Sequence, residues 1–113
     1  MSIVSGLILP DAARAGVTAP EPGMKREILV SSAAMTLVRH RMVQGWRGTA
    51  HSHPHEQMVY IVSGSIEVNV GGTSHRVQAG DSFIVASNVV HQATALEDSV
   101  VLDIFTPARE EYL

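Results

Sequence analysis

The sequence of 113 residues contains no cysteine. This absence excludes a disulfide framework, a thiolate metal site and a cysteine nucleophile, and it fits a reducing, cytoplasmic setting. Charged residues are also few, at 17% of the chain, and the formal net charge is only −3. Without a strongly basic face, the protein is not expected to bind nucleic acid or an anionic membrane surface.

Long hydrophobic runs are absent as well. The first apolar stretch, Ile3 to Leu9, ends at Pro10 and Asp11, far short of the roughly 20 residues that a membrane-spanning helix needs. No basic residue precedes this stretch, so we do not expect a cleaved signal peptide either. A chain of this length is expected to form one domain around a single core.

What the sequence does contain is a series of short, strand-like segments between glycine turns. They recur at roughly 8–12-residue spacing without a long stretch of helical periodicity. Residues Ile66–Val70 alternate between apolar and polar, which indicates a half-buried strand, and Gly71-Gly72 predicts a tight hairpin that returns along Thr73–Gln78. The pattern predicts an all-β fold, an antiparallel barrel or sandwich. Further strands are expected at residues 25–30, 35–42, 58–62, 82–85 and 100–106.

The first part of the chain reads differently. Residues 1–23 are predicted to be an irregular lead-in, because prolines and glycines interrupt them, with only a short helix at Asp11–Ala15. We expect the folded domain to span residues 24–113. The apolar strands near the N-terminus have no evident partner, which favours a homodimer with the lead-in at its interface.

Three of the six histidines, His51, His53 and His55, lie within five positions. In an extended segment residues i and i+2 face the same way, so His51 and His53 can direct two imidazoles at one point. Gln57 shares their parity, and a bend at Pro54 would bring its amide oxygen to the same point. Imidazole and carbonyl ligands suit divalent nickel, zinc, manganese or iron. The alternative for this heptad is a polar, histidine-rich surface loop.

Two separated segments resemble the two signature motifs of the cupin superfamily. The matching residues are Gly45, His51, His53, Gln57 and Gly64 in the first segment, and Gly80, Ala86, Asn88 and His91 in the second. Glutamine stands where most cupins have glutamate, and Ala86 and Asn88 stand where proline and glycine are usual. The resemblance implies a double-stranded β-helix, a small barrel or jelly roll, that holds one divalent metal ion per chain. By this resemblance the ligands are His51, His53, Gln57 and His91.

A narrower resemblance connects residues 24–29, 51–57 and 102–113 with the KdgF family of pectin-degradation cupins. Members of that family convert 4,5-unsaturated uronates, released from pectin or alginate by lyases, into linear ketonised sugars. The resemblance covers about residues 23–113. It implies a metal-dependent enzyme of sugar tautomerisation, isomerase-like or lyase-like, with a small sugar acid as its partner. Its further active-site residues would be Asp103, Phe105 and Arg109.

The residue types at these three positions suit those roles. Asp103 lies within an apolar strand, where a charged carboxylate is expensive to bury without a partner, and such a site favours general acid–base work. The planar fork of Arg109 suits two-pronged capture of a sugar carboxylate, and Phe105 could line the sugar's apolar face. The alternatives are an aspartate bonded to a strand-end amide or another chain's arginine, a surface arginine and a core phenylalanine.

The remaining candidates receive other roles. His55 has the ligand parity but follows Pro54, so we place it next to the ligands or at the pocket rim, among the substrate-contacting residues. His40 and His75 are interpreted as structural or solvent-exposed. Tyr60 has the wrong parity for the histidine site and is assigned to the core or an interface.

Two further functions remain open. One is a non-haem iron dioxygenase, which would need an open, redox-active iron site. The other is a binding module that holds a sugar or metabolite without turnover. Asp103 discriminates among the three hypotheses, because only the uronate-ketonising enzyme requires it.

Overall fold

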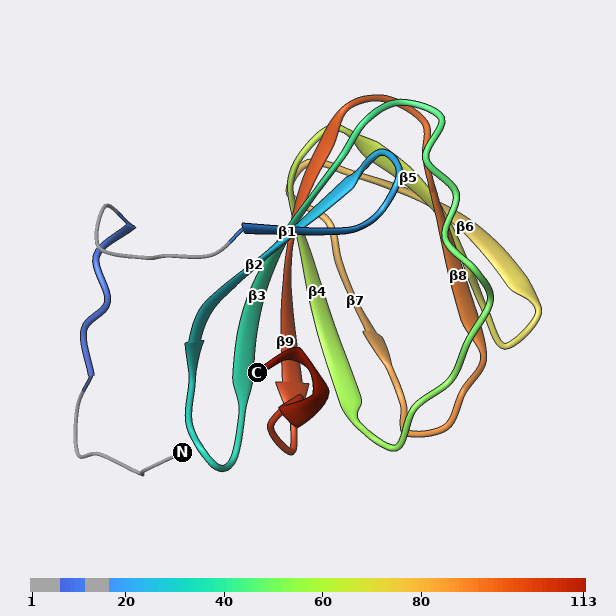
Figure 1. Cartoon of the computed structure of the whole chain (residues 1–113). Coiled ribbons are helices and arrows are strands. Elements are labelled where there is room, and N and C mark those ends of the chain that lie inside the picture. The colour runs from blue at the N-terminus through green and yellow to red at the C-terminus, as the bar shows by residue number, and fades with distance from the viewer. Residues whose placement is uncertain (1–6, 12–16) are drawn as a thin grey trace.

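The computed structural model describes residues 7–11 and 17–113, and within them the chain forms nine strands and a short C-terminal 3-10 helix, η2 (Glu110–Tyr112) (Figure 1). The strands are β1 (Val17–Glu21), β2 (Met24–Ser31), β3 (Thr36–Met42), β4 (Glu56–Ser63), β5 (Ser65–Val70), β6 (Thr73–Gln78), β7 (Ser82–Val85), β8 (His91–Ala95) and β9 (Ser99–Thr106). Over these residues no helix is long and apolar enough to cross a membrane.

The strands form two antiparallel sheets, which confirms the all-β class. The larger sheet has the order β1-β2-β3-β9-β4-β7, and the smaller has the order β6-β5-β8. Figure 1 shows β5, β6 and β8 on one side of the molecule, across from the larger sheet. The last strand, β9, lies between β3 and β4 in the larger sheet. This insertion brings the C-terminal strand beside β3 and β4, whose paired residues lie at least 37 positions earlier in the sequence.

Alternation along these strands separates an inner face from an outer face. The inner face of β9 carries Asp103 and Phe105, and both side chains are buried. At one end of the interior, apolar side chains form a core cluster of Met24, Met42, Val59, Ile61, Ile66, Ala95 and Val101. Polar side chains lie farther along the same inner faces, beyond this cluster. The fold therefore places a polar site inside an otherwise apolar barrel.

The irregular lead-in ends earlier than the sequence suggested. Val17–Glu21 forms the edge strand β1, with Val17 paired to Glu27 and Thr18 to Arg26. Pro20 lies in this strand, and an edge strand tolerates proline because one of its two sides needs no N–H donor. The register shifts between Thr18 and Glu21. The helix expected at Asp11–Ala15 falls mostly on residues 12–16, outside the described residues.

The glycine turns occur where the sequence places them. Gly71 and Gly72 both have positive φ, at 58° and 90°, and they connect β5 to β6 as expected. Gly64 also has positive φ, and a Cβ atom there would lie 2.4 Å from the carbonyl oxygen of Asp98. Only glycine permits this close approach between the β4–β5 turn and the chain that enters β9.

Candidate functional site

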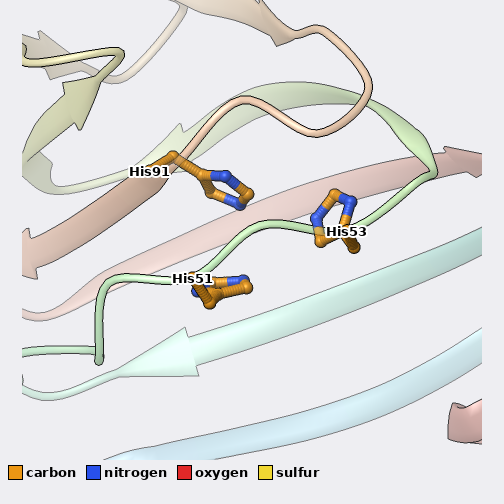
Figure 2. A group of neighbouring side chains, drawn as sticks. All are labelled: His51, His53 and His91. Atoms are coloured by element: carbon orange, nitrogen blue, oxygen red, sulfur yellow. The ribbon is translucent and has the colours of Figure 1, made fainter.

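Three histidines from two distant segments converge, and of these His53 and His91 are buried while His51 is exposed. His51 and His91 form an isolated antiparallel bridge, with backbone N–H···O distances of 3.0 and 2.9 Å. Their ring centroids are 4.3 Å apart, and those of His53 and His91 are 4.9 Å apart. One nitrogen from each ring lies within 4.8 Å of the other two, and Figure 2 shows the rings gathered around one point. The cluster is therefore able to hold a metal ion.

The hydrogen bonds of the three rings fix their tautomers. In each ring Nδ1 lies 2.9 Å from a backbone carbonyl oxygen, and the acceptors are those of Thr49, His55 and Val89. A carbonyl oxygen can only accept, so each Nδ1 carries the ring proton and each Nε2 keeps its lone pair. Nε2 of His91 is buried and has no hydrogen-bond partner among the described residues. This is the arrangement that a histidine metal ligand needs.

Burial favours the neutral form of two of these rings by lowering their pKa values. It lowers the pKa of His53, and the nearby positive charge of Arg109 lowers it further. Burial also lowers the pKa of His91. Because both rings resist protonation, their Nε2 atoms stay available to a cation near neutral pH.

Gln57, at the start of β4, faces the histidines. Its Oε1 lies 3.1 Å from Nε2 of His53, and its Nε2 donates a hydrogen bond of 2.7 Å to Oδ1 of Asp103. The second contact decides the orientation of the amide, because a carboxylate oxygen requires a donor. The carbonyl oxygen must therefore face the histidine cluster, where it would serve as a fourth ligand.

Asp103 has two side-chain partners at 2.7 Å. Its Oδ1 accepts from Gln57, and its Oδ2 accepts from Nδ1 of His40. The residue is only 3% exposed. Both carboxylate oxygens are therefore bonded to side chains of the same chain rather than to a strand-end amide. His40 was interpreted as structural or exposed, yet it belongs to the site. Its place on the same inward face as Val38 and Met42 was the available signal.

Tyr112 and Arg26 are two further residues that the sequence did not single out. The Tyr112 ring lies against two guanidinium groups, with its centroid 3.7 Å from Cζ of Arg26 and 4.5 Å from Cζ of Arg109. Burial raises the pKa of Tyr112. Helix η2 thus packs its aromatic residue beside the site, a placement that no local sequence pattern predicts.

Arg109 and Phe105 lie together. Arg109 is 9% exposed, its Nε donates to Glu111, and its Cζ is 4.8 Å from the centroid of the Phe105 ring. Its backbone N–H also donates to the hydroxyl of Thr36 at 2.8 Å. Arg109 is therefore buried and hydrogen-bonded, unlike the surface arginine considered as the alternative. Phe105 is 1% exposed and supports both the guanidinium and the His53 ring.

His55 lies behind the site. Its ring is buried, its Nε2 lies 3.3 Å from the carbonyl oxygen of Ala108, and it does not line the cavity described below. Its own carbonyl oxygen accepts from His53, so His55 orients a ligand through its backbone. His75 is exposed on β6, and Tyr60 is 44% exposed on β4.

A cavity of about 240 Å³ connects these groups between the two sheets. Its lining includes His51, Gln57, His91, Asp103, Phe105 and Arg109. This volume suits a small molecule, since pockets for larger ligands are usually more spacious. The histidine cluster, a carboxylate and an arginine therefore face one small cavity.

A family model described as "Cupin domain" matches residues 38–105. The chain belongs to the cupin family. Among curated proteins, this cupin is similar to the "Pectin degradation protein KdgF" of Dickeya dadantii (strain 3937). The two are 34% identical over 93 aligned residues, which cover 80% of this chain and 84% of that protein. The expected resemblance to KdgF is thereby confirmed.

Solved structures agree with this placement. KdgF from Halomonas sp. aligns with a TM-score of 0.84 and 36% identity, over 88% of this chain and 94% of that one. An RmlC-like cupin from Shewanella frigidimarina NCIMB 400 aligns with a TM-score of 0.89 and 31% identity, over 96% and 97%. A salicylate 1,2-dioxygenase from Pseudoaminobacter salicylatoxidans shares 17% identity at a TM-score of 0.72, over 78% of this chain and 28% of that one. That last likeness shows the fold alone.

The donor set of this cupin fits a divalent metal. Imidazole nitrogens suit nickel, zinc, manganese and iron alike, so the ligands do not select one of them. Three neutral histidines and a neutral amide would also leave the full 2+ charge of the ion uncompensated. Such a centre attracts anionic, oxygen-rich molecules more strongly than one that contains a carboxylate ligand.

Proposed function

We propose that this cupin ketonises 4,5-unsaturated uronate monosaccharides from pectin or alginate breakdown, with one divalent metal ion per chain. The observation that carries the proposal is the contact between Gln57 and Asp103, which places a buried carboxylate directly beside the candidate metal centre. Sensing or oxygenation would not require this carboxylate. The curated relative of the chain is named for pectin degradation, which supports the same chemistry.

The reaction is a tautomerisation that needs no co-reactant. The C1 hydroxyl of the sugar loses a proton, the bond between C1 and the ring oxygen breaks, and C1 becomes an aldehyde. The former ring oxygen becomes the carbonyl oxygen at C5, and C4 gains a proton. A bound metal would act as a Lewis acid on the sugar oxygens. The protein must supply a group that takes one proton and delivers one proton.

Asp103 is the residue we assign to this proton exchange. Its two hydrogen bonds, from Gln57 and His40, both use N–H donors, so both oxygens act as acceptors and the carboxylate is arranged to accept a proton. Both donors also hold the carboxylate in one orientation at the cavity wall. A general acid–base group of this kind contributes about 10²–10⁴-fold to a rate.

Arg109 and Phe105 would position the sugar. The guanidinium lies over the Phe105 ring at the cavity, where it can receive the C6 carboxylate of a uronate. The ring of Phe105 offers an apolar surface beside it. His55 is not part of this proposal, because its ring does not reach the cavity.

The test uses the ultraviolet band of the substrate. The ring double bond is conjugated with the carboxylate, and protonation at C4 destroys the conjugation. We expect the metal-loaded protein to accelerate decay of this band, a chelator to stop the acceleration, and added metal to restore it. If nickel, zinc, manganese and iron all fail to give acceleration, ketonisation is ruled out and a binding module becomes the better reading.

We further propose that this cupin is a homodimer. Its outer sheet face carries exposed apolar side chains on neighbouring strands, including Met58, Tyr60 and Ile84, and such surfaces favour association. Sedimentation equilibrium would measure the mass in solution, and a monomer at micromolar concentration would contradict the proposal. The cytoplasmic setting stays a prediction from the absence of cysteine.

A further inference from the structure

A line of hydrogen bonds leads from Asp103 away from the candidate metal centre. Oδ2 of Asp103 lies 2.7 Å from Nδ1 of His40, and Nε2 of His40 lies 3.1 Å from Nε of Arg26. The three residues come from β9, β3 and β2, which are adjacent in the larger sheet. Arg26 and His40 are also direct partners in the strand register. The line is therefore built into the sheet.

The chemistry of Arg26 fixes the proton of His40. The Nε–H of an arginine can only donate, so Nε2 of His40 must hold a lone pair. The single ring proton is then on Nδ1, from which it is donated to the Asp103 carboxylate. A doubly protonated His40 would set one N–H group against another across the 3.1 Å contact with Arg26. The contacts with Arg26 and Asp103 therefore favour the tautomer of His40 that carries its proton on Nδ1.

Tyr112 holds Arg26 in the orientation that this contact requires. The Arg26 guanidinium lies over the Tyr112 ring with Cζ 3.7 Å from its centroid. Such stacking restrains a planar guanidinium more than a lysine ammonium. The rings of Tyr112 and His40 are also nearly perpendicular, with centroids 6.4 Å apart. Helix η2 therefore packs against Arg26 and His40 through Tyr112.

We propose that Arg26 and His40 are positioning residues for the proton transfer assigned to Asp103. This inference rests on the proposed function. His40 supplies one of the two N–H groups that orient the carboxylate, and Arg26 keeps the His40 proton on the nitrogen that faces Asp103. Loss of either residue leaves the metal ligands untouched but frees the carboxylate to turn or to lose a partner. Residues that orient a reacting group in this way typically contribute about 10–100-fold.

Two amide substitutions separate positioning from mere packing. In His40→Asn the amide nitrogen can occupy the place of Nδ1 and still donate to Asp103. In His40→Gln the amide extends toward the place of Nε2, and that donor is lost. We expect kcat to fall about 10–100-fold in His40→Gln, with KM and metal content near those of the parent. His40→Asn should stay within about threefold to fivefold of the parent. His75→Gln, on an exposed residue of β6, is the matched control and should behave as the parent.

Several results would overturn the inference. They are a His40→Gln variant within about threefold of the parent, equal losses in the Asn and Gln variants, or a loss of metal content that accounts for the loss of rate. In each case an active parent leaves the proposed function intact. A parent without activity on the unsaturated uronate would overturn the function and this inference together.

A second measurement does not depend on turnover. The nitrogen chemical shifts of His40 in the zinc-loaded protein report which ring nitrogen carries the proton, and we expect protonated Nδ1. Arg26→Met removes the donor to Nε2 but keeps an apolar chain against Tyr112, so it should shift the tautomer toward a mixture. A proton on Nε2 in the parent, or an unchanged tautomer in Arg26→Met, would overturn the role assigned to Arg26.

Discussion

The amide of Gln57 connects the histidine cluster to Asp103, because its oxygen faces Nε2 of His53 and its nitrogen donates a hydrogen bond of 2.7 Å to the carboxylate. Glutamate could supply the oxygen but not the donor. The glutamine that departs from the usual cupin motif is therefore explained by its second contact. It permits a carboxylate to stand beside the centre without charge repulsion.

We predict that Gln57→Glu separates metal binding from catalysis. The new carboxylate would lie beside Asp103, and two carboxylates at this distance cannot both stay ionised. Metal content should be kept or increased, while catalysed decay of the ultraviolet band should fall at least about tenfold. The exposed Gln78→Glu introduces the same charge on β6 and is the control. A Gln57→Glu variant as fast as the parent would contradict the prediction.

We predict that Asp103→Asn loses about 10²–10⁴-fold in rate and keeps its metal. Asparagine has nearly the same shape but cannot exchange a proton near neutral pH. One of its side-chain atoms is a donor, which would oppose the N–H of Gln57 or His40, so we also expect a loss of about 1 kcal/mol in stability. Rate, elemental metal content and thermal unfolding check the three statements. A rate within about threefold of the parent removes Asp103 from the mechanism.

We predict that His91→Ala weakens metal binding more than His55→Gln does. The first loses a ligand whose buried Nε2 has no hydrogen-bond partner among the described residues, whereas the second keeps the backbone carbonyl that orients His53. The loss in His91→Ala should exceed the roughly 10–100-fold typical of removing an orienting group. Competition with a metal-binding dye measures both affinities. Equal losses would mean that the His55 side chain takes part directly.

Much of this site could be predicted because it depends on local parity and on motif spacing. His51 and His53 share the parity of an extended segment, a bend at Pro54 brings in Gln57, and the resemblance to the second motif supplied His91. The Gly71-Gly72 hairpin likewise follows from local conformation. None of these inferences required knowledge of which strands are neighbours.

The remaining contacts depend on the strand order, which local patterns do not encode. His40 contacts Asp103 only because β9 lies beside β3 in the sheet. The two residues are 63 positions apart in the sequence. Tyr112 enters the site because the chain turns back after β9 into helix η2. Strand β1 was missed because Pro20 suggests an irregular segment, although an edge position accommodates it.

We predict that Arg109→Lys lowers the affinity for a uronate without changing metal content. Lysine keeps the positive charge but cannot lie as a plane between Phe105 and Tyr112, nor bind a carboxylate with two parallel N–H groups. An increase of about tenfold in the apparent dissociation constant is expected. The control is Arg76→Lys on the exposed strand β6. If the parent binds the neutral sugar as well as the uronate, Arg109 does not select for the carboxylate.

Glu27 provides a prediction about acid stability. Its carboxylate accepts from Nε and Nη2 of Arg39, at 3.1 and 2.9 Å, and from Nε of Arg41 at 2.9 Å. The hydrogen bond from Arg39 is the largest influence that holds the pKa of Glu27 at about 2, below its usual 4.5. Because the folded state has the lower pKa, the ionised carboxylate stabilises the fold above about pH 5. This contribution is lost as the pH falls toward 2.

We therefore predict that Glu27→Gln lowers the free energy of unfolding by about 1–3 kcal/mol at neutral pH and much less near pH 2. The difference should fade between about pH 5 and pH 2, because the parent carboxylate becomes protonated over that range. Urea unfolding at a series of pH values measures it. Glu67→Gln, on an exposed residue of β5, makes the same charge change and should show little dependence. If the parent and Glu27→Gln differ by the same amount at pH 7 and pH 2, the arginine contacts of Glu27 do not contribute through its charge.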